Sequence, residues 1–218
     1  AEPGTRFPLA VAYRRSGMPA NADRYFRQLA SRNTQDAWRD CALTELWLNH
    51  GRGLPPKRIA KCSIAAEKPV LNGRLDDTIW REAHVMQLSS GQHDDTNWPA
   101  AAMIARDEEY LYLGASCRLV TGVSYPTNSD PRTRDAEISG RDRVDVCIDV
   151  DRDYASYYRL SMDHRGWTNE LCFGDTNWDP EWFVAAATRD GHWVVEAAIP
   201  LSELSADLPE TGDAWAIG

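Results

Sequence analysis

The spacing of apolar residues changes part-way along the chain, at Cys62, and this change limits the folds that the chain can adopt. Before Cys62, apolar side chains recur every three to four residues, which is the period of an amphipathic α-helix. In the segment 20–32, for example, Ala22, Phe26 and Leu29 would share one helical face. After Cys62, apolar and polar residues alternate, as they do in a half-buried β-strand. The pattern therefore predicts a helical N-terminal segment followed by an all-β region.

The helical segment should contain short antiparallel helices. The last of them is expected to run from an N-cap at Thr34 to a C-terminal Gly51. This pairing is weakly similar to a tetratricopeptide-type helical hairpin. The sequence GRGLPPKR (51–58) then combines glycines with paired prolines, which end a helix and stiffen a linker. We therefore expect residues 1–58 to form a helical hairpin segment and linker, and residues 59–218 to form a second domain.

Short segments with a two-residue period dominate that second domain, and turn residues separate them. Strands spaced in this way are typical of an antiparallel β-sandwich. We therefore predict a mainly β fold, an antiparallel β-sandwich with a small N-terminal α-helical segment. Because the last strand candidate reaches the final residues, we expect the sandwich to continue beyond Gly218. The predicted strands are 62–66, 99–106, 110–118, 143–150, 155–163, 167–173, 182–189, 192–199 and 214–217.

Two of these strands each carry a charged residue on the face that points away from the core, and the two charges are opposite. In RVDVCIDV (143–150) the valines and isoleucine alternate with Asp145, and in YYRLSM (157–162) the apolar residues alternate with Arg159. Since side chains alternate across a strand, both charged residues should face away from the core. A long polar stretch, 119–142, precedes the first of these strands, and a loop of this length is usually functional or mobile.

The composition excludes several classes of partner. The formal net charge of −9 argues against a nucleic-acid ligand, which requires a basic face. No run of 18 apolar residues occurs, so we expect no membrane span. The five cysteines include no C-x-x-C motif, which removes support for zinc-ribbon and thioredoxin-like sites and leaves disulfides or buried thiols open. Nine tryptophans are present, and such rings serve either as core or as sugar-binding and interface surfaces.

Four motifs and a final strand occur in an order that resembles family 9 carbohydrate-binding modules. The resemblance covers residues of about 62–218 and does not include the helical segment. The motifs are KPVLNGRLDDTIWREA (68–83), ARDEEYLYLGASCR (105–118), RDRVDVCIDVD (141–151), GHWVVEAAIPLSEL (191–204) and GDAWAIG (212–218).

The resemblance implies a β-sandwich that binds sugars without catalysis, a secreted protein and a structural calcium ion. In the family, two tryptophans clamp a terminal sugar while polar side chains bond its hydroxyls. Carried over by position, Asp145 matches a sugar-bonding acid and Arg159 matches a sugar-bonding arginine. At the position of the first clamping tryptophan this chain has Ser139, and the second clamp position lies beyond Gly218.

Further candidates come from the residues themselves. A tryptophan in a turn-rich segment can stack on a pyranose face, and Trp98, Trp167, Trp178 and Trp182 lie in or beside such segments. The stretch GDTNWDPEW (174–182) interleaves aromatic, acidic and amide side chains. The candidate carbohydrate-binding residues are Asp145, Arg159, Asp142, Arg141, Trp178, Trp182 and Trp98.

The stretch DVDRD (149–153) spaces Asp149, Asp151 and Asp153 like oxygen ligands for calcium. It lacks the glycine and terminal glutamate of an EF-hand loop, and an acidic turn exposed to solvent would have the same composition. The sequence thus makes these three aspartates the candidate calcium ligands and requires no other cofactor.

We therefore predict a non-catalytic carbohydrate-binding domain of a larger secreted protein, located outside the cell, in the periplasm or at the cell surface. Its partner would be a saccharide or polysaccharide, bound by its end on one sheet face, with protein partners at the helical segment. One alternative is an interaction or scaffold domain that has lost the sugar site. A part of a glycoside hydrolase is a further alternative, but nothing marks two acids as a catalytic pair.

Overall fold

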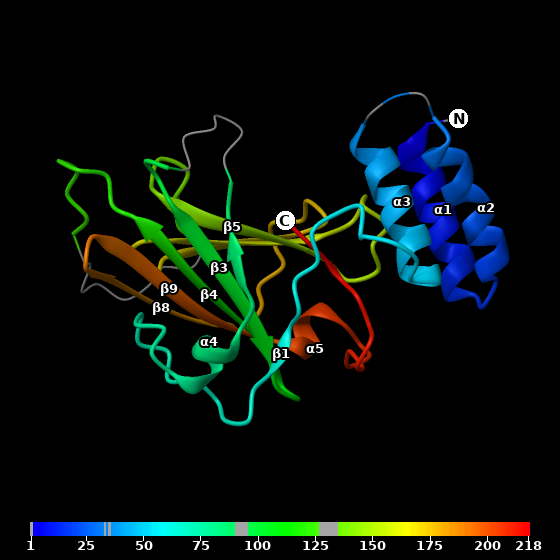
Figure 1. Cartoon of the computed structure of the whole chain (residues 1–218). Helices are drawn as coiled ribbons and strands as arrows, with labels where there is room; N and C mark the ends of the chain where they lie inside the picture. The colour runs from blue at the N-terminus through cyan, green and yellow to red at the C-terminus, as the bar shows by residue number, and fades with distance from the viewer. Residues whose placement is uncertain (1, 33, 35, 90–95, 127–134) are drawn as a thin grey trace. The chain divides into compact units, whose positions relative to one another are not determined.

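The computed structural model describes the chain except residues 1, 33, 35, 90–95 and 127–134 (Figure 1). It forms two compact units, which we call the helical unit and the sheet unit and describe separately. None of the described helices is long and apolar enough to cross a membrane. The helical unit comprises Ala1–Ile59, Ile148–Tyr157 and Ala214–Ile217, and the sheet unit comprises Ala60–Cys147, Tyr158–Asp213 and Gly218.

The helical unit is built on α1 (Pro3–Arg15), α2 (Pro19–Ala30) and α3 (Ala37–His50), which lie side by side (Figure 1). Their shared core includes Phe7 and Phe26, whose ring centroids are 5.3 Å apart. The prediction of short helices in this segment is confirmed.

The ends of α3 show how local chemistry sets a helix. The N-cap is Asp36, whose carboxylate accepts the Arg39 N–H at 2.9 Å, so the prediction of Thr34 as the cap is wrong. Thr34 instead donates its hydroxyl to Asp36 at 2.8 Å. Gly51 ends the helix as predicted, at φ 62°, in the left-handed region that glycine adopts without steric penalty.

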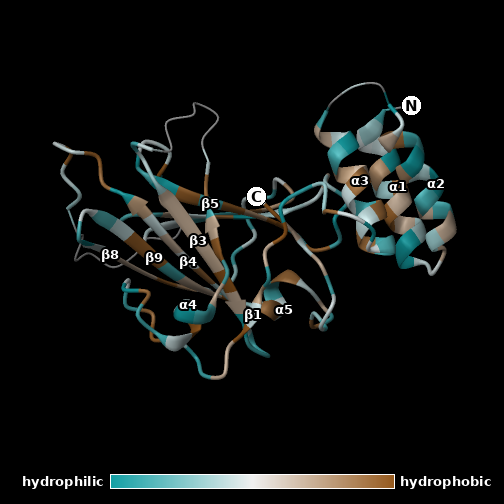
Figure 2. Ribbon diagram, in the orientation of Figure 1, coloured by the Kyte–Doolittle hydropathy of each residue, from teal (hydrophilic) through white to brown (hydrophobic). Residues whose placement is uncertain are grey.

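The larger sheet has the strand order β1-β3-β4-β9-β8, and β2 pairs with residues 101–103 of β3. It is mixed, because β1 runs parallel to β3 while the other pairs are antiparallel. In Figure 2 the hydrophobic colours are seen along β3 and on α5 (Leu201–Leu204), which follows β9 directly. The strands are β1 (Ser63–Ile64), β2 (Val85–Gln87), β3 (Ala100–Arg106), β4 (Tyr110–Arg118), β8 (Phe183–Arg189) and β9 (His192–Pro200).

The smaller sheet is antiparallel, with the order β10-β5-β6-β7. Its inner face carries Val144, Val146, Leu160 and Met162, all of them buried. The alternation predicted for 143–150 is therefore confirmed. The strands are β5 (Arg143–Asp149), β6 (Tyr158–Asp163), β7 (Thr168–Cys172) and β10 (Ala216–Ile217).

The first family motif forms a turn and the short helix α4 (Thr78–Glu82), which carries the buried Trp80. Gly73 lies at φ 73°, and a Cβ there would come within 2.6 Å of the Ala187 nitrogen, so only glycine fits the turn. The N-cap of this helix is Asp77, whose side chain makes no capping hydrogen bond. Trp80 belongs to a buried cluster with Tyr112 of β4 and Ala198 of β9, so the motif anchors the larger sheet.

Candidate functional site

The candidate sugar-contacting residues Asp145 and Arg159 lie on adjacent strands, β5 and β6, of the smaller sheet. Cys147 lies two residues after Asp145 on β5. Burial raises the pKa of the Cys147 thiol, the charge of Asp145 raises it further, and the charge of Arg159 lowers it. Both charged groups therefore act on one thiol, as expected for side chains on the same face. We call the surface carrying Asp145, Cys147 and Arg159 the outer face.

Asp145 forms its ion pair with a neighbour on its own strand. Arg143 Nε lies 3.0 Å from both carboxylate oxygens of Asp145, and its Nη1 donates to the Ser139 carbonyl at 2.9 Å. Both members of the pair are about one-third exposed, at 33% and 37%. An ion pair this accessible to water contributes about 0–1 kcal/mol. A ligand hydroxyl can therefore compete for the Asp145 oxygens at little energetic cost.

Arg159 differs from its neighbours because its guanidinium is not used to hold the sheet together. Its Nε is buried, and among the described residues it has no hydrogen-bond partner. The ion pairs formed within the described part of the chain do not include Arg159. A buried donor without a partner costs about 1–3 kcal/mol, so the residue is placed at some expense to stability.

The end of the long loop borders the outer face. Asp142 accepts a hydrogen bond from the Tyr125 hydroxyl, and Arg141 is exposed, with its backbone N–H donating to the Ile138 carbonyl at 3.0 Å. Ser139 is held by Glu137, which accepts its N–H at 2.8 Å. Residues 127–134 of this predicted loop lie outside the described residues. A small side chain thus occupies the position where the family resemblance placed a clamping ring.

The structure separates the tryptophan candidates. Trp98 is 42% exposed just before β3. Trp178 is half-buried and packs on Tyr158 with ring centroids 4.9 Å apart. Trp167 lies under the Arg165 guanidinium, 4.0 Å from the ring centroid. Trp182 is only 3% exposed and donates its indole N–H to the buried Glu170, so its ring serves the core and offers no surface for stacking.

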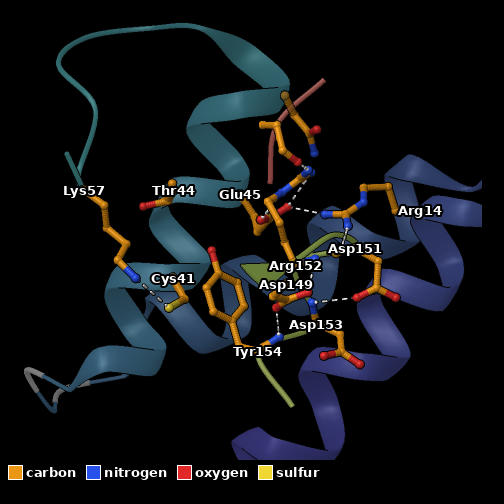
Figure 3. A network of polar contacts seen from close by, with 12 residues as sticks. Arg14, Cys41, Thr44, Glu45, Lys57, Asp149, Asp151, Arg152, Asp153 and Tyr154 are labelled. Carbon is orange, nitrogen blue, oxygen red and sulfur yellow. Dashed lines mark hydrogen bonds and ion pairs between the residues drawn. The ribbon is translucent and has the colours of Figure 1, made fainter. Parts of the chain in front are cut away.

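The calcium candidates Asp149, Asp151 and Asp153 belong to the helical unit, and their ligand atoms lie within 4.8 Å of one another (Figure 3). Their oxygens already accept hydrogen bonds from the chain. Asp149 accepts the N–H groups of Arg152 at 2.6 Å and Tyr154 at 2.7 Å. Asp153 accepts two backbone N–H groups and a serine hydroxyl. We call residues 149–153 the acidic loop.

Arginine side chains supply the positive charge beside the acidic loop. Arg15 lies 3.0 Å from an Asp151 carboxylate oxygen, and Arg14 donates to the Asp151 carbonyl. Carboxylates are the ligands that calcium prefers, but a cation here would have to displace Arg15 and the backbone donors. The carboxylates of the acidic loop therefore already have hydrogen-bond partners within the chain, and the loop does not fit a preformed calcium site.

Glu45 of α3 organises this cluster, and nothing in the sequence marked it. Its side chain is fully buried and accepts from Arg14 and from Arg152 Nε, the latter at 2.8 Å (Figure 3). Burial, together with the nearby Asp151 and Asp153, raises the pKa of Asp149 to about 6. In the sequence, Glu45 looks like any other glutamate on a helix. Whether such a side chain is buried or exposed cannot be told until the fold is known.

Comparison with known proteins identifies the family. The sequence model of the family described as "Carbohydrate family 9 binding domain-like" matches residues 71–217, more than half of the chain. A comparison with curated proteins found no match. Two similar solved structures are family 9 carbohydrate-binding modules from Caldicellulosiruptor kristjanssonii, one in complex with cellotriose and one with glucose.

The first of these structures is 17% identical, with a TM-score of 0.48, and the match covers 72% of this chain and 74% of that chain. For the second, the values are 18%, 0.45, 68% and 70%. The family match confirms the predicted family, and the pair of sheets confirms the predicted fold class. With residues 71–217 matching its model, the chain belongs to the family of carbohydrate family 9 binding domain-like proteins.

Proposed function

We propose that this domain binds a saccharide without catalysis, through the outer face of its smaller sheet. The observation that carries the proposal is Arg159, a guanidinium whose buried Nε has no hydrogen-bond partner among the described residues. Guanidinium groups carry five donors in a fixed fork, and sugar hydroxyls and ring oxygens are acceptors for them. Membership in a carbohydrate-binding family supports this choice of ligand.

In this proposal Arg159 donates hydrogen bonds to the sugar, and Asp145 accepts one from a hydroxyl. Bonds in which one partner is charged are stronger than neutral ones, which favours a ligand with several hydroxyls. Arg143 can release one Asp145 oxygen because their pair is accessible to water. Since Ser139 offers no ring beside this face, binding would depend on these polar contacts more than on stacking.

Secretion and a location outside the cytoplasm belong to the proposal, because most polymeric saccharide ligands are extracellular.

All five cysteines are free thiols, which answers the question that their spacing left open. The alternative of an interaction domain is favoured by one observation, the serine at position 139 in place of a clamping ring. The two functions make opposite predictions about sugar binding.

The test is calorimetry of the full chain with a panel of neutral and acidic mono- and oligosaccharides, with and without calcium. We expect binding, and a loss of at least about tenfold in affinity for Arg159→Gln, because one charged hydrogen bond is worth about 1.5–3 kcal/mol. Arg189→Gln is the matched control, since Arg189 is half-exposed on the larger sheet and, among the described residues, pairs with its neighbour Asp190 alone.

Each result decides a separate point. Binding that Arg159→Gln weakens and Arg189→Gln leaves unchanged supports the outer face as the site. Equal binding by both variants shows that the saccharide binds elsewhere. If no saccharide in the panel binds the wild-type chain, the sugar-binding proposal fails and the interaction domain remains.

A further inference from the structure

We propose that a second sugar-contacting surface, an aromatic platform formed by Tyr158, Phe173 and Trp178, stacks on a pyranose ring of an oligosaccharide. This inference rests on the proposed function, because it takes the ligand to be a saccharide. It places a subsite for a further sugar unit at the end of β6 that carries Arg159. All three residues belong to the sheet unit.

The platform begins at a tight turn after β7. The N–H of Cys172 donates to the Asp175 carbonyl at 3.0 Å, and the N–H of Asp175 donates to the Cys172 carbonyl at 2.8 Å. Between them, Phe173 and Gly174 have φ values of 53° and 88°. Positive φ at both central residues defines a type I′ turn, in which asparagine, aspartate or glycine is favoured at the first position.

Phenylalanine is an unfavourable residue at this position. A bulky residue in the left-handed region is a steric outlier, and such conformations cost about 1–3 kcal/mol. Burial of the ring does not compensate, because Phe173 remains 59% exposed. Nothing in the fold itself therefore explains an exposed aromatic ring at a turn that asparagine would suit better. A role in binding does explain it.

Tyr158 packs on Phe173, and Trp178 packs on Tyr158. Tyr158 lies 5.4 Å from Phe173 and 4.9 Å from Trp178, measured between ring centroids. Tyr158 and Trp178 are half-buried, so their orientations are constrained by packing. Rigid aromatic rings offer a large contact area with little loss of conformational entropy, which suits the apolar C–H face of a sugar ring.

Polar groups border the platform on one side. Asp175 and Asn177 are exposed, and Asn177 donates both its N–H, at 2.9 Å, and its side-chain amide, at 2.8 Å, to one Asp175 oxygen. These bonds hold the pKa of Asp175 below its ordinary value, so the carboxylate is charged at neutral pH. Its second oxygen can accept from a sugar hydroxyl, which is the usual complement of a stacking ring.

The platform and Arg159 lie at the same end of the same pair of strands. Tyr158 precedes Arg159 in β6, and in the register of β6 with β7, Cys172 pairs with Tyr158 while Leu171 pairs with Arg159. One strand residue spans about 3.3 Å, and the turn begins at Cys172, one residue beyond the position that pairs with Arg159. Because successive side chains of a strand point to opposite faces, Tyr158 lies on the opposite face of the smaller sheet from Arg159, and a saccharide whose end binds at Arg159 reaches Phe173 by passing round the end of the strand.

The test compares a monosaccharide with oligosaccharides of increasing length, using calorimetry of the full chain. The central variant is Phe173→Asn, which removes the ring and installs a residue that the turn prefers, so the domain should fold and its Tm should not fall. We expect affinity for the monosaccharide to stay unchanged and affinity for the longer ligands to drop about fivefold or more. Trp178→Ala should act in the same direction.

Phe183→Ala is the control, because Phe183 is a comparably exposed ring, at 54%, on β8 of the other sheet. If Phe173→Asn binds all lengths like the wild type, the platform is wrong, while an effect of Arg159→Gln would leave the proposed function standing. If Phe173→Asn weakens oligosaccharide binding and Arg159→Gln does not, the platform stands and the outer-face site fails. A wild-type chain that binds no saccharide would overturn both.

Discussion

The indole N–H of Trp80 donates to Glu196 Oε1 at 2.7 Å, and this bond joins α4 to the centre of the larger sheet. The other carboxylate oxygen of Glu196 accepts the backbone N–H groups of Asn72, Gly73 and Arg74. One fully buried carboxylate thus satisfies a turn and a helix at once. The entry motif depends on an acid that lies more than a hundred residues away in the sequence.

Replacing that acid should destabilise the sheet unit. Glu196→Gln keeps the size of the side chain, but it replaces one acceptor oxygen by an NH2 group. This group would face N–H donors and leave buried N–H groups unpaired. We expect a loss of about 2–4 kcal/mol in the free energy of unfolding, measured by urea denaturation. The exposed Glu210→Gln is the control and should change it by less than about 0.5 kcal/mol. Equal effects of the two variants would contradict the role assigned to Glu196.

The turn that Glu196 binds should also tolerate no side chain at Gly73. In Gly73→Ala the new Cβ meets both an unfavourable φ and the Ala187 backbone at 2.6 Å, so we expect a loss of about 2 kcal/mol or more. Gly191→Ala is matched for φ, at 76°, but has no atom within 4 Å of the added Cβ. The difference between the two free energies of unfolding measures the steric clash alone. A difference near zero would show that the turn can shift.

Glu45 should be as important to the helical unit. Removing its charge in Glu45→Gln leaves Arg14 and Arg152 facing each other without a counter-ion, and breaking a buried pair costs about 3–5 kcal/mol. We expect faster hydrogen exchange of the amides in α3 and in the acidic loop. Asp40→Asn, at an exposed position of the same helix, provides the comparison. Exchange rates that match between the two variants would show that the buried network contributes little.

The raised pKa of Asp149, about 6, predicts a pH dependence of stability. The folded state binds this proton more tightly than the unfolded state, whose carboxyl titrates near its ordinary value of about 3.9. The contribution is therefore fully present below about pH 4 and is lost as pH rises through about 6. It amounts to at most about 3 kcal/mol, from 1.36 kcal/mol per unit of pKa.

Asp149→Asn cannot titrate, so the difference in unfolding free energy between wild type and variant should fall from pH 4 to pH 7. Carboxylates with lowered pKa, such as Asp107, have the opposite dependence and cancel in this difference. Urea denaturation at each pH provides the measurement. A difference that is constant with pH would mean that Asp149 titrates normally in the folded chain.

Calcium should have little effect on the stability of the chain, because the oxygens of the acidic loop already accept hydrogen bonds and Arg15 pairs with Asp151. We expect the Tm of the chain to be the same in a calcium buffer and in a chelator. A rise in Tm with calcium that Asp151→Asn abolishes would overturn this expectation and restore the ion that the family resemblance implies.

Periodicity made most of the strands predictable, since alternation depends only on which residues avoid water. The predicted segments 110–118 and 143–150 correspond closely to β4 and β5. Strand β2, at Val85–Gln87, was missed because it is short and half-exposed, so its sequence has no apolar alternation. Strand β2 forms because its backbone pairs with β3. The sequence also gave no sign that the acidic loop belongs to the helical unit, because this loop is held there by the ion pair of Arg152 with Glu45.

The family, the order of helix and sheet, and the outward direction of Asp145 and Arg159 could be predicted from the amino-acid sequence, because motif order and a two-residue period are local properties. How each polar group is used depends on the folded chain. It paired Asp145 with Arg143, left Arg159 Nε without a partner among the described residues, buried Trp182 against Glu170 and exposed Phe173. Burial and pairing depend on segments brought together from distant parts of the chain, and no local pattern records them.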